Sequence, residues 1–309
     1  MRRCKPVAVS IFTLVLLLGV VSASILLMPD TTHQPDENGM YQQEGYWVQY
    51  RGGYDEKSAS AFCRKLESLA DTMLTDQNHL YYALIPDKSH YLPDEGYPVL
   101  DFSALEQQVQ QEISPRFTQI ELADVLTLDS YYKTDLHWRQ ETLQPVLDAL
   151  GNAMDFSLDL SQWQPHQMDS FVGSYGKYIS SPTPETLMYL TSDATEQAQV
   201  DNLQTPDVHT VYDLSKLDTN NAYDMFLDGA TPLVTIQNPN ASTNRELVIF
   251  RDSYSSSLAP LLCGVYKTIT MIDIRYMVSG LVPQYVTFTN QDVLFLYSGW
   301  VVNQSAMLR

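Results

Sequence analysis

A serine stands where a buried strand is predicted to meet a helix, a position suited to nucleophilic catalysis. Four consecutive apolar residues at 247–250 predict the strand, and apolar spacing from 256 to 266 predicts the helix. Ser253 lies between them, so a rigid element would hold its hydroxyl near the free N–H groups of the first helical turn. A simpler interpretation competes with this one, because Asp252 or Ser253 could be the residue that caps the helix.

Asp135 and His137 carry the groups that activate a serine hydroxyl. Residues two apart do not face each other on a helix, but in an extended or turn segment both side chains can point to one side. A carboxylate beside a histidine holds the imidazole in one tautomer and stabilises its positive charge, which makes the histidine a suitable base for a serine. Taken alone, Asp135 could equally cap the following helix, with His137 an ordinary residue of its first turn.

Other kinds of site find little support in the sequence. Three convergent metal ligands cannot be named among the histidines, cysteines and carboxylates, so no metal site is predicted. Neither a phosphate-binding loop nor a glycine-rich dinucleotide motif is present, and no cofactor is expected. The net charge of −19, from 18 basic and 37 acidic residues, argues against nucleic-acid binding.

The segment from Tyr132 to Trp138, YKTDLHW, resembles the signature Y-x-T-D-x-H-W of the DHHW protein family. Leu136 stands where the family name has a second histidine, a position without a catalytic part in the interpretation above. Further segments resemble the family in the same order along the chain. They are Pro86–Lys88, Phe171–Tyr175, Phe226–Gly229, Arg251–Tyr254, Asp273–Tyr276 and Asp292–Tyr297.

DHHW proteins are similar to the SGNH-hydrolase-like domains of alginate O-acetyltransferases. In those domains an Asp-x-His segment precedes the serine, whereas in ordinary SGNH hydrolases the serine comes first, so the order is circularly permuted. The resemblance implies that Ser253 is the nucleophile, His137 its base and Asp135 the carboxylate that orients the histidine. It also implies a site at the carboxyl edge of a parallel sheet, where α/β proteins commonly bind ligands.

The groups that would stabilise an oxyanion are less determined than the three residues above. The N–H of Ser253 is a natural donor at a helix start. Tyr254, Gly229 and Arg251 are further oxyanion or substrate-binding candidates, although Tyr254 could equally be a packed aromatic and Arg251 crowds the turn. Arg275 is a fourth candidate, which could reach the site from the next strand or simply pair with Asp273.

The elements expected around these residues alternate between helix and strand. Strands are predicted at 79–85, 117–122, 246–250, 268–274 and 293–297, and helices at 54–74, 103–113, 138–150 and, more weakly, 276–281. Ser103 and Glu106 are expected to open the second helix as a capping box, and Gly151 to end the third. These patterns predict an α/β fold, a mostly parallel sheet with helices on both faces, of the permuted SGNH-hydrolase-like form that the resemblance implies.

A section from 152 to 244 differs from this rhythm, because helical periodicity is lost there. Short strands at 187–191, 208–214 and 233–236, separated by Pro, Asp, Asn and Gly, predict an inserted β-rich section of the domain.

The N-terminus has the pattern of an export segment. Basic residues precede an almost uncharged run from 7 to 28, which is long enough to span a bilayer and leaves the rest of the chain outside the cell. Residues 1–30 are expected to be an uncleaved signal anchor, with a signal peptide cleaved near Ser22–Ser24 as the alternative. Polar residues 31–53 are expected to link this anchor to one domain at 54–309, where Cys63 and Cys263 could form a disulfide or remain free.

Two functions of different classes follow from these features. The first is a serine O-acyltransferase or esterase at a bacterial cell surface, acting on acetyl groups of an envelope or extracellular polysaccharide. As a transferase it would need a membrane-bound partner that hands acetyl groups across. The second is a non-catalytic glycan-binding or envelope-assembly protein on the same scaffold, because a fold does not establish an activity.

Overall fold

The computed structural model describes residues 33–207, 209–217, 219 and 221–309, and the predicted anchor at 1–30 lies outside them. Within these ranges no helix is both long and apolar enough to cross a membrane. The helices and strands are β1 (Met40–Gln43), β2 (Tyr46–Gln49), α2 (Glu56–Met73), β3 (His79–Ile85), α3 (Phe102–Glu112), β4 (Phe117–Gln119), α4 (Gln144–Met154), β5 (Gln164–Phe171), β6 (Glu185–Thr191), α5 (Asp193–Gln197), β7 (Gln199–Asn202), β8 (Leu233–Gln237), β9 (Glu246–Arg251), α6 (Ser255–Leu262), β10 (Thr268–Ile272), β11 (Asp292–Ser298) and α7 (Gly299–Val302).

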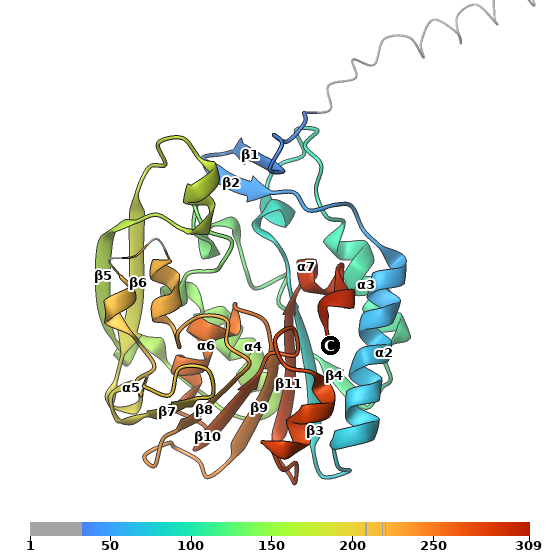
Figure 1. Cartoon of the computed structure of the whole chain (residues 1–309), viewed down its shortest axis with the longest axis vertical. Coiled ribbons are helices and arrows are strands. Elements are labelled where there is room, and N and C mark those ends of the chain that lie inside the picture. Colours follow the sequence, from blue (N-terminus) through green and yellow to red (C-terminus); the bar gives the residue numbers. More distant parts are fainter. Residues whose placement is uncertain (1–32, 208, 218, 220) are drawn as a thin grey trace, which may run out of the picture.

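The central sheet has the order β4-β3-β11-β9-β10-β8-β7 in the described chain (Figure 1). The strands from β4 to β10 pair in parallel, and β8 runs antiparallel to both of its neighbours. The predicted α/β class with a mostly parallel sheet is confirmed. Because parallel strands end at the same edge, the segments that follow β3, β9, β10 and β11 begin there, at the edge of the sheet that faces the β1–β2 hairpin (Figure 1).

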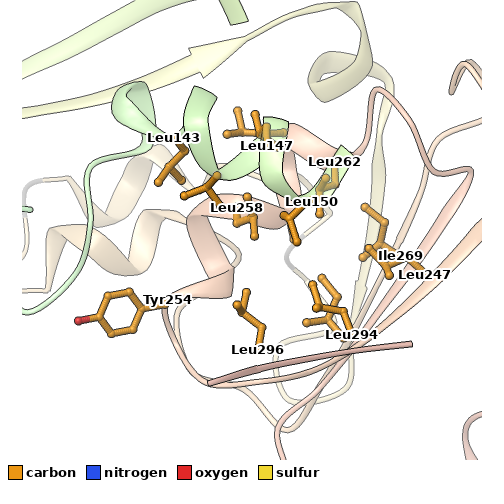
Figure 2. Close-up of a cluster of buried hydrophobic side chains, with 14 of the residues drawn as sticks. Leu143, Leu147, Leu150, Leu247, Tyr254, Leu258, Leu262, Ile269, Leu294 and Leu296 are labelled. Carbon is orange, nitrogen blue, oxygen red and sulfur yellow. The ribbon is translucent and has the colours of Figure 1, made fainter. Parts of the chain in front are cut away.

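Separate apolar clusters cover the two faces of the sheet. Alternate residues of β9 divide between them: Leu247 and Ile249 join one cluster, and Val248 and Phe250 join the other. Helices α4 and α6 cover the first face, while α2, α3 and α7 cover the second. Figure 2 shows the first cluster, in which the leucines of α4 and α6 meet those of β9 and β11. Strands buried on both faces explain the apolar runs without alternation.

Two predicted helix signals are wrong. Gly151 lies inside α4, which continues to Met154 and ends where Asp155 takes a left-handed φ of 56°. A Cβ at Gly151 would lie 2.4 Å from the carbonyl oxygen of Phe156, so this glycine permits a close approach of backbone instead of ending the helix. The cap of α3 is Asp101, whose carboxylate accepts the N–H of Ala104, and Ser103 already lies inside the helix.

Helices near the site also differ from prediction in length. Pro145 stands in the first turn of α4, so the helix begins at Gln144 and the residues after His137 are not part of it. Helix α6 ends at Leu262 instead of 266, and 279–284 form a 3-10 helix.

The section at 152–244 contributes in two ways. Strands β5 and β6 form their own antiparallel pair, whereas β7 and β8 extend the central sheet. The strand predicted at 208–214 is wrong for the described residues, where one bridge joins Tyr212 to Phe226. Strand β5 escaped prediction because its mostly polar sequence, QPHQMDSF, lacks an apolar alternation.

Part of the predicted linker is folded. Residues 40–49 form the β1–β2 hairpin, in which Glu44 and Gly45 make the turn with positive φ and Tyr41 and Val48 are buried. The two short strands carry glutamines on both faces, so the sequence shows no clear apolar alternation there. Cys63 and Cys263 are free and belong to the clusters on opposite faces of the sheet, so they do not pair.

Candidate active site

Ser253 occupies the turn between β9 and α6, at the carboxyl edge of the sheet. Asp252 shapes this turn, because its carboxylate accepts the N–H of Tyr254 at 3.1 Å and that of Ser298 at 2.7 Å. Asp252 and Tyr254 are buried, whereas Ser253 between them is partly exposed. No side chain caps α6, whose N-cap residue is Tyr254, so the predicted capping role of Asp252 or Ser253 is wrong. The Asp252 carboxylate instead braces the turn before the helix, and the hydroxyl of Ser253 is presented from this buried, hydrogen-bonded support.

Asp135 and His137 lie in a loop closed by a backbone bridge between Tyr131 and Trp138. The loop is neither helix nor strand, which agrees with the turn that the two-residue spacing required. The ammonium group of Lys88 is fully buried beneath it and donates to the carbonyl oxygens of Tyr132 and Asp135. Lys88 belongs to one of the segments that resemble the family, but nothing in the sequence around it predicts this contact.

The three predicted side chains form a continuous hydrogen-bonded row. His137 Nε2 lies 2.7 Å from Ser253 Oγ, and His137 Nδ1 lies 2.6 Å from Asp135 Oδ1. With the Nδ1 proton donated to the carboxylate, Nε2 is free to accept the serine proton. The expected contacts are thus present across 116 residues of sequence.

Asp135 is held as an ionised carboxylate. Burial by itself would raise its pKa, but the His137 charge, the His137 ring hydrogen bond and the N–H groups of Ser174 and His137 together lower the pKa below its usual range. The N–H of Ser174 lies 2.6 Å from Oδ2, and that of His137 lies 2.8 Å from Oδ1. A Cβ at the neighbouring Gly173 would lie 2.2 Å from the Asp135 Cβ, so glycine is needed for this close approach.

Tyr223 completes the surroundings of the histidine and was not identified from the sequence. Its ring stacks on the His137 imidazole with centroids 4.0 Å apart and planes 1° apart, and its hydroxyl donates to Ser257 Oγ at 2.8 Å. Trp138 donates its Nε1–H to the same Ser257 hydroxyl, at 2.9 Å. Nothing in the local sequence distinguishes Tyr223 from the other 19 of the 20 tyrosines.

The further oxyanion candidates make other contacts. Tyr254 donates its hydroxyl to the Leu136 carbonyl at 2.6 Å and its N–H to Asp252, so it is a packed aromatic of the first turn. Gly229 donates its N–H to the Phe226 carbonyl at 3.1 Å, which removes it as an oxyanion donor in this arrangement. The N–H of Ser253 makes no hydrogen bond within the described ranges and remains the available donor.

The two arginines are structural in their contacts. Arg251 is fully buried, and its guanidinium donates to the carbonyl oxygens of Gly229 and Thr231 and to Ser256 Oγ. Arg275 makes two bonds to the Asp273 carboxylate, at 2.9 Å and 2.6 Å, which is the alternative that the sequence left open. Neither guanidinium has a hydrogen bond to Ser253 or His137.

Comparison with known proteins confirms the resemblance found in the sequence. The family model described as DHHW protein matches residues 126–272. That match includes the Asp135–His137 loop and the Ser253 turn. No curated protein matches the chain.

Solved structures with a similar fold include those of three proteins. A DHHW family protein from Eubacterium siraeum superposes with a TM-score of 0.69 and 19% identity, covering 86% of this chain and 93% of that one. PatB1 of Bacillus cereus gives 0.68 and 17%, covering 85% and 96%. The O-acetyltransferase domain of Pseudomonas putida AlgJ gives 0.51 and 11%, covering 86% and 92%. At these identities the likeness concerns the fold.

Proposed function

We propose that this chain is a cell-surface serine O-acyltransferase or esterase that acts on acetyl groups of an envelope or extracellular polysaccharide. The observation that carries the proposal is the row Asp135–His137–Ser253, with contacts of 2.6 Å and 2.7 Å. A nucleophile, its base and the carboxylate that orients the base are the groups that acyl transfer through serine requires. Likeness to a domain named as an O-acetyltransferase supports the acetyl group as the one transferred.

In the first half of the reaction, Ser253 Oγ attacks the carbonyl carbon of an acetyl ester while His137 Nε2 takes the hydroxyl proton. The oxyanion that forms is stabilised by the Ser253 N–H at the start of α6. Asp135 stabilises the imidazolium, because its carboxylate is buried and ionised beside Nδ1. The imidazolium then protonates the leaving group, and the acetyl group remains on Ser253.

In the second half, a sugar hydroxyl or water attacks the acetyl-serine, with His137 as base once more. Transfer and hydrolysis use the same three residues and differ in the acceptor. We further propose that residues 1–30 anchor the domain on the outer face of the membrane, where a membrane-bound partner supplies acetyl groups. The charge pattern before residue 7 and the apolar run after it support this location.

The test is the reaction of the full-length chain with p-nitrophenyl acetate. We expect release of nitrophenol and, by mass spectrometry, an acetylated peptide that contains Ser253. Ser253→Ala should abolish the adduct, and His137→Ala should slow its formation by about 10²–10⁴-fold, because an unassisted hydroxyl is a weak nucleophile. Ser103→Ala, an exposed serine of α3, is the matched control. An adduct that survives in Ser253→Ala would refute the proposed nucleophile, and a protein that never forms one would point to the non-catalytic alternative.

A further inference from the structure

Asp224 has a carboxylate without a partner beside the candidate site. It lies in a short 3-10 helix, Ala222–Met225, directly after the tyrosine that stacks on His137. The side chain is half-buried, and it makes no hydrogen bond or ion pair in the described part of the chain. Lys216, whose charge acts on Asp224, is itself paired with Asp228 at 2.7 Å.

The charge of His137 influences the pKa of the Asp224 carboxyl group. Burial raises the pKa of Asp224, and the charge of His137 is the largest influence that opposes the rise, ahead of Lys216. The oxygens of Asp224 make no hydrogen bond to described residues and remain accessible to solvent, so a bound ligand can replace water and donate to them. Carboxylates whose pKa is perturbed in such a place are candidates for functional sites.

The turn that packs against Asp224 has a strained backbone. Leu227, Asp228 and Gly229 all have positive φ, of 55°, 58° and 73°. A Cβ at Gly229 would lie 2.4 Å from Asp224 Oδ1, so the turn packs directly against the carboxylate. Arg251 holds this turn through the Gly229 carbonyl, at 3.2 Å. The strand that presents Ser253 therefore also positions Asp224.

We propose that Asp224 accepts a hydrogen bond from a hydroxyl of the acceptor sugar and so orients the neighbouring hydroxyl toward acetyl-Ser253. The inference rests on the proposed function and assigns it an acceptor, a polyhydroxylated sugar. A carboxylate that is fixed by its surroundings binds such hydroxyls through charge-assisted hydrogen bonds, which are stronger than bonds between neutral groups.

The transfer step balances without any further reactant. The oxygen of the acceptor hydroxyl forms a bond to the acetyl carbonyl carbon, and its proton passes to His137 Nε2. The bond between that carbon and Ser253 Oγ breaks, and Oγ takes the proton back from His137. Asp224 takes no part in the proton transfer and acts as a specificity residue for the acceptor.

The experiment measures how acetyl-Ser253 divides its acetyl group between competing acceptors. The full-length protein receives p-nitrophenyl acetate together with cellotetraose, chitotetraose or methanol, and acetylated product is compared with released acetate. We expect Asp224→Asn to lower the ratio for at least one oligosaccharide by about tenfold or more, since a hydrogen bond to a charged group is lost. The ratio for methanol, which has no second hydroxyl, should change less than about twofold.

Two further variants separate the sugar contact from general damage. Gly229→Ala should displace the Asp224 carboxylate and lower the same ratio. The double variant Gly229→Ala/Asp224→Asn should show little additional loss, because both substitutions act on one contact. Asp201→Asn, an exposed aspartate of β7, should leave all ratios unchanged.

Three results would overturn the inference. They are an unchanged oligosaccharide ratio in Asp224→Asn, an equal fall with methanol, and no transfer to either oligosaccharide by an unmodified protein that does form acetyl-Ser253. Absence of acetyl-Ser253 itself would instead refute the proposed function, so the two failures are distinguishable.

Discussion

The β9–α6 turn and the loop from Tyr132 to His137 meet at the contact between Ser253 and His137, and they are held in different ways. The turn depends on regular backbone structure, with paired strands on both sides of β9 and the first turn of α6, together with the Asp252 carboxylate, which accepts N–H groups of Tyr254 and Ser298. In the described chain the loop has no such backbone pairing around its catalytic residues and depends on individual groups from other segments. Its atoms accept hydrogen bonds from the Lys88 ammonium group and the Ser174 N–H, and one of its N–H groups donates to the Glu185 carboxylate. The partners in these bonds lie 39 to 52 residues apart in the sequence.

The difference concerns where each side chain obtains its orientation. A serine at the end of a buried strand is oriented by regular backbone structure, which resists local change. A histidine in an irregular loop is oriented by individual hydrogen bonds, and the loss of any one of them can change its orientation. We therefore expect substitutions around the loop to reduce activity more than they reduce stability, and substitutions behind the turn to do the reverse.

Of the substitutions around the loop, Asp135→Asn should reduce activity most. The amide cannot stabilise the imidazolium, and we expect the rate of Ser253 acetylation to fall by on the order of 10³–10⁴-fold. Because the pKa of Asp135 is lowered in the folded protein, its charge stabilises the fold above about pH 4 and this stabilisation is lost as the pH falls through the folded pKa. Acetylation kinetics and denaturant unfolding at several pH values measure the two effects. A fall in rate below tenfold would contradict the orienting role.

Lys88→Met should have the next largest effect. Without the ammonium group, the carbonyl oxygens of Tyr132 and Asp135 lose a buried donor and the loop shifts, and we expect acetylation to slow by about 10–10²-fold. Burial lowers the pKa of Lys88 to about 8. The unfolded chain therefore binds more protons between about pH 8 and 10.5, and the stability of the unmodified protein relative to the variant should rise with pH across that window.

The control for this variant is Lys57→Met, which removes an exposed lysine of α2. Equal acetylation rates and parallel pH dependence of stability in the Lys88 and Lys57 variants would show that the loop does not depend on the buried ammonium group.

Leu258→Ala should have the smallest effect on activity and a clear effect on stability. Leu258 is fully buried in α6, between α4 and the sheet (Figure 2). Its truncation should cost about 2–5 kcal/mol of unfolding free energy, through lost apolar burial and a cavity. Because backbone pairing still presents Ser253, the rate per folded molecule should stay within about threefold. A tenfold loss in a protein that remains folded would mean that the turn also depends on packing behind it.

The central strands and helices could be predicted because their patterns are local. An apolar run such as 247–250 buries all of its side chains only inside a sheet that is covered on both faces, and β9 lies in such a sheet. Strand β5 is mostly polar and the hairpin strands carry glutamines on both faces, so neither shows the apolar alternation from which a strand is predicted. The role predicted for Gly151 is wrong because a glycine needed for a close contact cannot be distinguished, in sequence, from a glycine that ends a helix.

The sequence by itself determined the chemical groups of the candidate site, their order along the chain and their resemblance to a known family. It also placed Ser253 correctly, because strand and helix periodicity locate a turn. The tertiary structure alone decided which side chains meet. Tyr223 on the imidazole, Lys88 under the loop and Arg251 behind Gly229 are contacts between segments far apart in sequence, and neither spacing nor composition encodes the distance between such segments.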